Sequence, residues 1–246
     1  MELAAEFLAA ECLVHIYVNT QHVTSLLASP ENLDELAWGH LQTEYALHHL
    51  TEFETHITAH GEEFTVEITT ATELLLTSRN SIVTTSCGAC EQDQLGALIE
   101  QTPSVSNPPR QISIEALIRS LNQMRNHQPG FGETGGMHAA GLFFDEGEEL
   151  LVREDIGRHN AVDKVIGAMS SVSQSTPHAL LLSGRCGWDI VSKAAKLDIP
   201  IIASIGAAST LAVKTARASN MTLVSFAKSN RAVVIGPVEG RIQRNH

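Results

Sequence analysis

Cys87 and Cys90 stand three positions apart in a chain of 246 residues. Two thiols at this spacing can supply half of a zinc site, cycle between dithiol and disulfide, or carry a sulfur atom. Cys12 and Cys186 stand alone in the sequence, so no second pair completes a zinc site. The surrounding residues 84–94 are polar and show no helical or strand period, which places the pair on a loop. A structural role, a redox or sulfur-transfer role and a metal-binding role all stay open from the spacing.

Two further segments carry groups that bind anions. Ser183, Gly184 and Arg185 come directly after an apolar run and before residues with helical spacing, and Arg158 and His159 lie at the start of an amphipathic stretch. Helix N-termini bind anions through free N–H groups and the helix dipole, and Arg can add a bidentate phosphate contact. Both segments therefore predict phosphate contacts, and the alternative for each is an ordinary solvated helix start.

A segment near the C-terminus combines an aromatic ring, two cations and small polar groups. Its residues are Phe226, Ala227, Lys228, Ser229, Asn230 and Arg231. This combination suits a nucleotide, whose base stacks on the ring while the cations hold phosphate. A basic hairpin without a ligand is the alternative.

Gly135 and Gly136 stand before His138 and an apolar strand. Paired glycines permit a close approach of the backbone to another group. His138 can be a ligand, a base or a hydrogen-bonded core residue, and the core role is the commonest for a half-buried histidine.

Strands and helices alternate in the second half of the chain. Strands are predicted at 139–144, 179–183, 199–204 and 223–226, and helices at 160–169, 189–197 and 209–219. Such alternation indicates an α/β sheet with parallel strands covered by helices. Ligands of these sheets bind where the strands end, which is where the anion-compatible segments lie.

The first half has a different pattern. A hairpin is predicted from 12–19 to 23–27, a helix begins at Ser29 as N-cap, strands follow at 64–69 and 74–85, and a helix spans 112–126. Residues 103–109 contain three prolines and indicate a linker. We therefore predict an N-terminal α+β region carrying the cysteine pair at 1–108, a connecting helix and linker at 109–130, and an α/β domain that binds a phosphate-bearing ligand at 131–246.

The charge distribution narrows the function. Residues 1–129 hold 17 acids and four bases, whereas residues 130–246 hold 11 acids and 12 bases, within a net charge of −12. A wide nucleic-acid-binding face is therefore not expected. Apolar runs are shorter than the roughly 20 residues of a membrane span, and the start of the chain has no basic leader pattern. Four cysteines are too few for a disulfide scaffold, so we expect the cytoplasm.

Several motifs together resemble the FdhD family, the formate dehydrogenase accessory sulfurtransferases. The motifs are TGGMHAA at 134–140, REDIGRHNAVDKVIG at 153–167, SGR at 183–185, IPIIAS at 199–204, STLAV at 209–213 and the cysteine pair. The resemblance covers nearly the whole chain, and the stretch at 153–164 is its most specific part.

The resemblance implies a cytidine-deaminase-like three-layer core, a homodimer and a cytoplasmic protein. It implies that Cys87 carries a persulfide received from a cysteine desulfurase, with Cys90 as its partner or substitute. The sulfur would pass to the molybdenum or tungsten bis-guanine-dinucleotide cofactor before this enters formate dehydrogenase. Residues 226–231 match the family's cofactor-binding segment, and by their position Gly135, Gly136, His138, Arg158, His159 and residues 183–185 would complete the pocket. No structural metal is expected.

The sequence departs from the family pattern at Glu91, Cys186 and Asp189. An acidic neighbour such as Glu91 disfavours both a thiolate and a bound anion. Two other functions compete with sulfur transfer. A zinc deaminase needs a His-x-Glu and a Pro-Cys-x-x-Cys motif, but Ala140 and Ser86 stand where the Glu and the Pro are required. A non-catalytic cofactor-binding chaperone, with incidental cysteines, is the second alternative.

Overall fold

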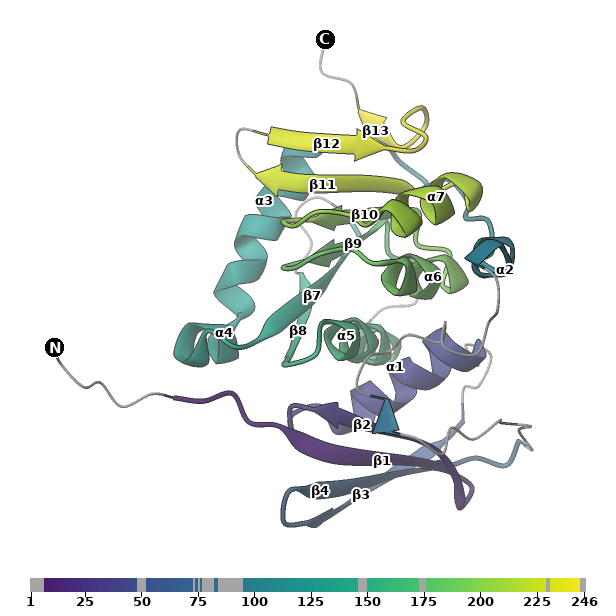
Figure 1. The fold of residues 1–246 in the computed structure, drawn as a ribbon, viewed down its shortest axis with the longest axis vertical. Helices are drawn as coiled ribbons and strands as arrows, with labels where there is room; N and C mark the ends of the chain where they lie inside the picture. The colour runs from purple at the N-terminus through teal and green to yellow at the C-terminus, as the bar shows by residue number, and fades with distance from the viewer. Residues whose placement is uncertain are drawn as a thin grey trace, which may run out of the picture.

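The computed structural model describes residues 7–47, 52–72, 74, 76, 82–83, 95–145, 150–172, 176–228 and 231–243. Two large β-sheets form the molecule, with helices between them and around the larger sheet (Figure 1). The predicted mixed α/β class is confirmed. The cytidine-deaminase-like layering and the domain boundaries stay predictions.

The smaller sheet has five strands in the order β3-β4-β1-β2-β5. These are β1 (Cys12–Val18), β2 (Gln21–Ala28), β3 (Glu54–His60), β4 (Glu63–Thr69) and β5 (Ile82–Val83). Every second side chain of β1 is buried, because strand side chains alternate between faces. The buried ones pack against α1 (Leu33–Tyr45). The predicted hairpin of β1 and β2 is confirmed.

Helix α1 begins later than the sequence predicts. We expected Ser29 as its N-cap, but Asn32 has that position, with a left-handed backbone (φ 55°). The Ser29 hydroxyl instead accepts a hydrogen bond from the backbone N–H of Ile156, and the Ser29 N–H donates to Asp155. The prediction was wrong because a serine that bonds a distant element looks the same in sequence as one that caps a helix.

The larger sheet has six strands in the order β12-β11-β10-β9-β7-β8. These are β7 (His138–Phe143), β8 (Leu151–Asp155), β9 (Ala179–Leu182), β10 (Ile201–Ser204), β11 (Thr222–Lys228) and β12 (Arg231–Ile235). Strands β9, β10 and β11 are parallel, and β7 is antiparallel to both β8 and β9. Strand β8 therefore runs in the same direction as β9. The four strands predicted in this half are confirmed, whereas the charged residues of β8 concealed its strand character.

Helices cover both faces of this sheet. One face packs against α5 (Arg158–Val172), α6 (Trp188–Lys196) and α7 (Thr210–Ala218), and the other against α3 (Ile114–Met124). Helix α3 was expected to connect two regions, but its apolar side is part of the core of the sheet. The remaining elements are α2 (Leu95–Glu100), a 3-10 helix (Arg125–His127), α4 (Pro129–Thr134) and the short ladder of β6 (Ile112–Ser113) with β13 (Ile242–Gln243). Within the described ranges, no helix has the length and apolar character of a bilayer span.

Helices α1 and α5 cross between the two sheets (Figure 1). A Cβ atom on Gly39 of α1 would lie 1.7 Å from the carbonyl oxygen of Asp163 on α5. A Cβ atom on Gly167 of α5 would lie 1.9 Å from the carbonyl oxygen of Glu35 on α1. Only glycine permits this approach of two backbones. The crossing thus fixes the distance between the two sheets.

Candidate functional site

One edge of the larger sheet brings together the segments that the sequence singled out. Strands β8, β9, β10 and β11 end at this edge, at Asp155, Leu182, Ser204 and Lys228, and β7 begins there at His138. The helices α5, α6 and α7 follow β8, β9 and β10, so their N-termini lie at the same edge. The arrangement is the usual place for a ligand of an open α/β sheet.

His138 lies between two loops of this edge. It pairs with Asp155 in the β7–β8 ladder, and its Nδ1 atom is 3.4 Å from the Cβ position of Gly184. Burial and the nearby charges of Arg158 and Arg185 lower the pKa of His138 below its ordinary value. The imidazole is therefore neutral at neutral pH beside two cations. This corner has the chemistry of an anion site with one neutral hydrogen-bonding group.

The segment Ser183-Gly184-Arg185 is fixed by its neighbours on both sides. The Ser183 hydroxyl accepts from the Ala139 N–H at 2.8 Å, and the Ser183 N–H donates to the Ala139 carbonyl at 3.0 Å. The Gly206 N–H donates to the Gly184 carbonyl at 3.1 Å. Because the backbone is held on both sides, the exposed Arg185 side chain projects from a fixed point.

Phe226 has an unusual backbone conformation for a large residue, with φ at 52°. Its N–H donates to the Gly206 carbonyl at 3.1 Å, and its ring is 39% exposed. The Arg231 guanidinium lies 5.5 Å from the ring centroid. A strained, exposed aromatic residue beside a cation is a typical feature of a binding site.

The other residues of the predicted segment 226–231 differ in their exposure and in whether the structure describes them. Lys228 and Arg231 are exposed and face each other across the β11–β12 ladder, as in the basic hairpin that was the alternative. The Ala227 side chain is buried among the residues under α3 and does not line the edge. Ser229 and Asn230 lie outside the described residues, so their cofactor contacts stay predictions.

Gly135 and Gly136 are exposed at the end of α4, which leads into β7. Gly135 ends the helix in a left-handed conformation with φ at 68°. The Glu154 carboxylate accepts from the N–H groups of Gly130 and Phe131 at 2.8 and 2.9 Å, which fixes the start of α4 on β8. Both predicted glycines therefore lie beside the strand that carries His138.

Arg158 and His159 open α5 but face different surroundings. Arg158 is half-buried and close enough to His138 to affect its charge. His159 is only 6% exposed, and its imidazole contacts the Asp189 carboxylate at the start of α6. Burial, with the Arg158 charge, lowers the pKa of His159 to about 4 in spite of Asp189. The His159 side chain thus holds two helix starts together in the interior.

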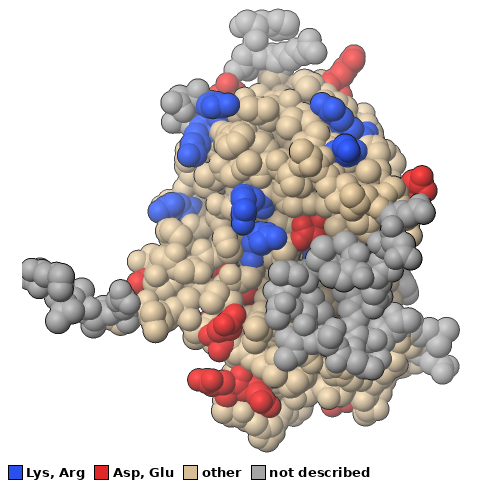
Figure 2. Space-filling view, viewed as in Figure 1, with Lys and Arg blue, Asp and Glu red and all other residues tan. Residues whose placement is uncertain are grey.

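Charge on the molecular surface follows the two halves of the sequence. On the face shown in Figure 2, basic side chains lie over the larger sheet and its helices, whereas acidic ones are spread over both parts of the molecule. An anion is therefore drawn toward the larger sheet in a protein of net negative charge.

A family model described as the FdhD/NarQ family matches residues 9–242. The chain belongs to the FdhD/NarQ family. A relative named Sulfur carrier protein FdhD, from Sulfolobus acidocaldarius, is 35% identical over 229 residues, which cover 92% of this chain and 87% of the relative. A protein of the same name from Shewanella oneidensis is 35% identical over 234 residues, or 93% of this chain and 84% of the relative.

A solved structure is similar as well. A crystal structure from Desulfotalea psychrophila, described as a candidate formate dehydrogenase accessory protein, matches with a TM-score of 0.71 and 25% identity. The match covers 96% of this chain and 91% of that chain. The resemblance to the FdhD family found in the sequence is therefore confirmed.

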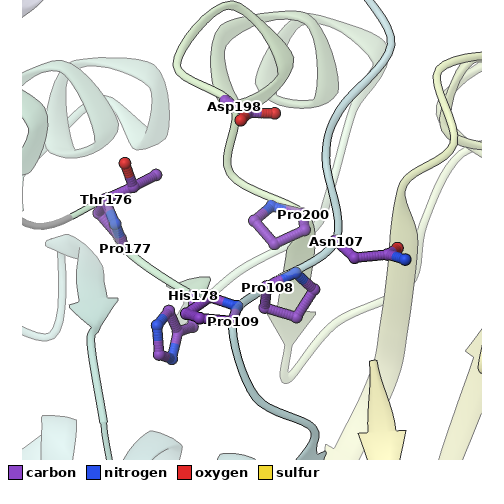
Figure 3. Close-up of a pocket in the computed structure, with 8 residues that line it drawn as sticks. All are labelled: Asn107, Pro108, Pro109, Thr176, Pro177, His178, Asp198 and Pro200. Carbon is purple, nitrogen blue, oxygen red and sulfur yellow. The ribbon is translucent and has the colours of Figure 1, made fainter. Parts of the chain in front are cut away.

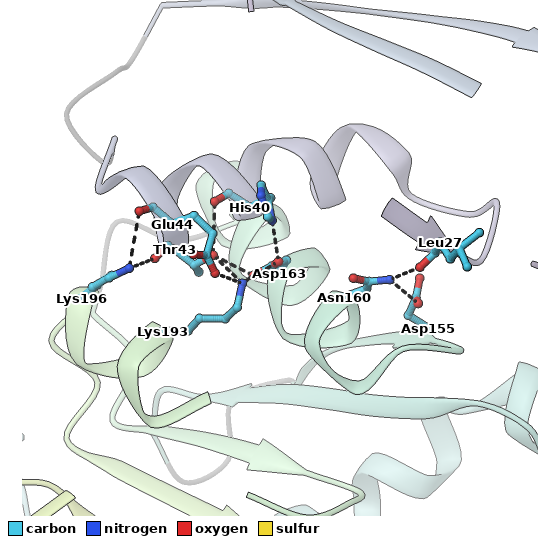
Figure 4. Close-up of polar contacts among 9 residues, drawn as sticks. All are labelled: Leu27, His40, Thr43, Glu44, Asp155, Asn160, Asp163, Lys193 and Lys196. Atoms are coloured by element: carbon cyan, nitrogen blue, oxygen red, sulfur yellow. Dashed lines mark hydrogen bonds and ion pairs between the residues drawn. The ribbon is translucent and has the colours of Figure 1, made fainter. Parts of the chain in front are cut away.

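The stretch at 153–164, which is the most specific part of the family resemblance, is largely buried in this FdhD/NarQ family member. Asp155 and Lys164 are fully buried and form an ion pair at 2.7 Å. Asn160 donates from its amide to Asp155 at 3.0 Å and to the Leu27 carbonyl at 2.8 Å (Figure 4). Within this stretch, site roles were predicted only for Arg158 and His159. Asp155 ends β8 and its partners Asn160 and Lys164 lie on α5, so no helical or strand spacing in the sequence marks these pairs.

A second buried network joins α1 to α5 and α6 in the same family member. The Lys193 ammonium donates to both carboxylate oxygens of Asp163, at 2.6 and 2.8 Å, and to the Thr43 hydroxyl at 2.9 Å (Figure 4). Its nitrogen also lies 3.0 Å from the Glu44 carboxylate. His40 places Nδ1 3.3 Å from Oδ2 of Asp163. The charged groups of this network pair with one another inside the protein, so they are not available to bind a ligand.

Two of the four cysteines of this family member are buried. Cys12 is 5% exposed and Cys186 is 1% exposed. Burial raises the pKa of Cys12 to about 11, and burial with the nearby Asp189 charge raises that of Cys186 to about 12. Cys87 and Cys90 lie outside the described residues. The described chain on either side is β5, which pairs with β2, and α2, which packs near α7.

A cavity of about 370 Å³ lies at the opposite edge of the larger sheet (Figure 3). It is lined by Asn107, Pro108, Pro109, Thr176, Pro177, His178, Asp198 and Pro200. None of the predicted site residues within the described ranges lines it. The cavity is therefore separate from the candidate site.

Proposed function

We propose that this protein is a sulfur carrier. It takes persulfide sulfur from a cysteine desulfurase on Cys87, with Cys90 as partner, and passes the sulfur to the molybdenum or tungsten bis-guanine-dinucleotide cofactor, its substrate. The sulfurated cofactor then enters formate dehydrogenase. The protein acts in the cytoplasm as a homodimer. The names of its relatives, sulfur carrier protein FdhD, support the carrier role.

The observation that carries the proposal is the burial of the other two thiols. A sulfur carrier needs an accessible thiolate. With pKa values of about 11 and 12, Cys12 and Cys186 hold their protons at neutral pH, and neither side chain is reached from solvent. Elimination leaves Cys87 and Cys90 as the carriers.

The described residues on the N-terminal side favour delivery to the strand-end edge. Strand β5 is parallel to β2, with Leu26 opposite Val83, so the chain leaves Val83 in the direction in which β2 reaches Ser29. Ser29 in turn contacts Asp155, which lies at that edge. Cys87 is four residues beyond Val83, a length of chain that spans at most about 14 Å.

The edge itself suits a ligand that bears phosphates. Arg158 and Arg185 flank the neutral His138, and Lys228 and Arg231 stand at the far side next to the Phe226 ring. Phosphates are held by guanidinium and ammonium groups and by helix N-termini, and a guanine base can stack on an aromatic ring. These residues would hold the cofactor by its dinucleotide ends.

Loading and delivery are both thiol–disulfide exchange steps of the cysteine pair. In loading, the Cys87 thiolate attacks the outer sulfur of the desulfurase persulfide; a new S–S bond forms, the old one breaks, and the desulfurase thiolate leaves. In delivery, the Cys90 thiolate attacks the inner sulfur of the Cys87 persulfide. A Cys87–Cys90 disulfide forms, and the outer sulfur leaves as sulfide, reduced by two electrons that the two thiols supply. A cellular dithiol reductant then restores both thiols.

Intact-mass spectrometry after incubation with cysteine and a desulfurase tests the carrier. The proposal predicts a gain of one sulfur atom that a reductant removes and that is absent in Cys87→Ala. A Cys12→Ala/Cys186→Ala variant is the matched control and should load normally. Loading that persists in Cys87→Ala/Cys90→Ala would refute the assignment.

A chaperone that holds the cofactor is the second candidate, because the basic edge alone suffices for it. The two functions differ in one result. Sulfur transfer predicts that Cys87→Ala/Cys90→Ala fails to activate formate dehydrogenase. Full activation by this double variant would favour the chaperone.

A further inference from the structure

The carboxylate of Asp155 is a buried junction between the two sheets. It accepts from the Ser29 N–H at 3.0 Å, the Gly157 N–H at 2.8 Å and the Asn160 amide at 3.0 Å, and it pairs with Lys164 at 2.7 Å. Asp155 and Lys164 are fully buried. Ser29 follows β2 at the end of the smaller sheet, whereas the other partners belong to α5 and to the turn between β8 and α5.

The same groups also hold the backbone at the end of β2. The Lys164 ammonium donates to the Ser29 carbonyl at 3.0 Å. The Asn160 amide donates to the Leu27 carbonyl at 2.8 Å (Figure 4). The Ile156 N–H donates to the Ser29 hydroxyl at 3.0 Å. The end of β2 is thus bonded to the β8–α5 turn through its N–H, carbonyl and hydroxyl groups.

This end of β2 determines where β5 lies. Ser25 and Leu26 pair with Ile82 and Val83 through backbone hydrogen bonds. A shift of the β2 end relative to the larger sheet therefore shifts β5 with it. The chain that leads to Cys87 starts from β5.

On the other side, the junction adjoins the candidate site. Asp155 is the ladder partner of His138, and its charge acts on that imidazole. Arg158 follows the same turn by three residues. One carboxylate thus connects the strand that leads to the cysteine pair with the residues that would receive the cofactor.

We propose that Ser29, Asp155, Asn160 and Lys164 are positioning residues for sulfur delivery. They fix the β2–β5 edge against the corner of His138, Arg158 and Arg185, so that a loaded thiol and the bound cofactor meet in one geometry. This inference rests on the proposed function. Buried ionic groups are weak sources of stability compared with apolar packing, which favours a role in geometry for a network of this size.

The test separates loading from delivery. Asn160→Ala removes both amide bonds, and the milder Ser29→Ala removes only the hydroxyl. Thr43→Val is the matched control, because the Thr43 hydroxyl donates to Asp163 at 2.8 Å and so joins α1 to α5 through the other buried network. For each variant, persulfide loading by a desulfurase and formate dehydrogenase activation per loaded protein are measured, together with Tm and the KM for cofactor.

We expect loading within about twofold of wild type and delivery slower by about tenfold or more in Asn160→Ala, since a misplacement of about 1 Å is enough for such a loss. Ser29→Ala should show a smaller loss, and KM for cofactor should not change. Thr43→Val should deliver normally at a comparable loss of Tm.

Two results would overturn the inference. One is normal delivery by folded Asn160→Ala and Ser29→Ala. The other is a loss of delivery that follows Tm equally in all three variants, which would make the junction merely structural. A wild-type protein that is never loaded would instead refute the proposed function.

Discussion

The Cβ position of Gly39 on α1 lies 1.7 Å from the carbonyl oxygen of Asp163 on α5. The Asp163 carboxylate is at the same time held by Lys193 of α6, so the residue that packs against the glycine also anchors a buried ion pair. The backbone contact and the ionic network therefore both hold α1 against α5 at the same point between the two sheets. Asp163 therefore sets how α1 lies on α5, whereas the Asp155 network fixes the end of β2, from which the chain to Cys87 is positioned.

Gly39→Ala should destabilise the protein. The added methyl meets a backbone atom that cannot rotate away, so we expect the free energy of unfolding to fall by about 3 kcal/mol. Gly132→Ala is the matched control, because nothing lies within 4 Å of its Cβ position on α4. The control should change stability by less than about 1 kcal/mol, measured by urea denaturation. A Gly39→Ala protein as stable as wild type would mean that the helices do not cross this closely.

His159 should make stability depend on pH. Its pKa in the folded protein is about 4, chiefly because it is buried. An unfolded chain binds that proton at a pKa of about 6.5. Between these values only the unfolded state is protonated, so stability falls as pH is lowered from about 6.5 to 4, by about 1.4 kcal/mol per pH unit for this one group.

Urea denaturation across this pH range measures that slope. His159→Gln should flatten it, and His127→Gln, at an exposed position, should leave it unchanged. The same slope in His159→Gln and wild type would show that the buried imidazole is not neutral.

The buried cysteines should resist alkylation. In the native protein at pH 8, iodoacetamide should modify Cys87 and Cys90 at least about tenfold faster than Cys12 and Cys186, because reaction requires an accessible thiolate. Denatured protein is the control, and all four thiols should react in it. Peptide mass spectrometry gives the rates. Rapid alkylation of Cys186 in the native protein would contradict its exclusion as a sulfur carrier.

Arg185 should contribute to cofactor binding. Loss of a charge-assisted contact costs roughly 1.5–3 kcal/mol, so Arg185→Ala should weaken binding by about tenfold or more. Arg217→Ala removes the same charge from an exposed position in the last turn of α7 and should have little effect. Binding is measured with cofactor released from a purified dehydrogenase. Equal losses in the two variants would indicate only a general charge effect.

The sequence predicted the strands of the larger sheet because their apolar runs are buried on both faces and are bounded by turns. Residues 183–185 and Phe226 were expected at one edge because they end parallel strands. His138 begins its strand and reaches that edge only because β7 is antiparallel to β9, which the sequence did not predict. Nor did the sequence reveal β8, where Arg153 bonds Glu35 of α1 at 2.5 and 2.6 Å. A charged residue with a distant partner has no local signature.

The same limit explains the departures from the family pattern. Asp189 contacts the buried His159, and Cys186 lies in the apolar core beside α6, so both side chains make contacts within the protein. Glu91 lies outside the described residues. Which polar residue faces a ligand and which faces another helix depends on contacts across more than a hundred residues of sequence, as for Ser29 and Asp155.

A sulfur chase tests the central claim most directly. The protein is loaded with radioactive sulfur from labelled cysteine and a desulfurase, separated from both, and mixed with sulfur-free cofactor. We predict that label moves from wild-type protein to the cofactor, and that an Arg158→Ala/Arg185→Ala variant loads equally but does not transfer. Label that stays on the wild-type protein, or that leaves the double variant at the wild-type rate, would contradict delivery at this edge of the sheet.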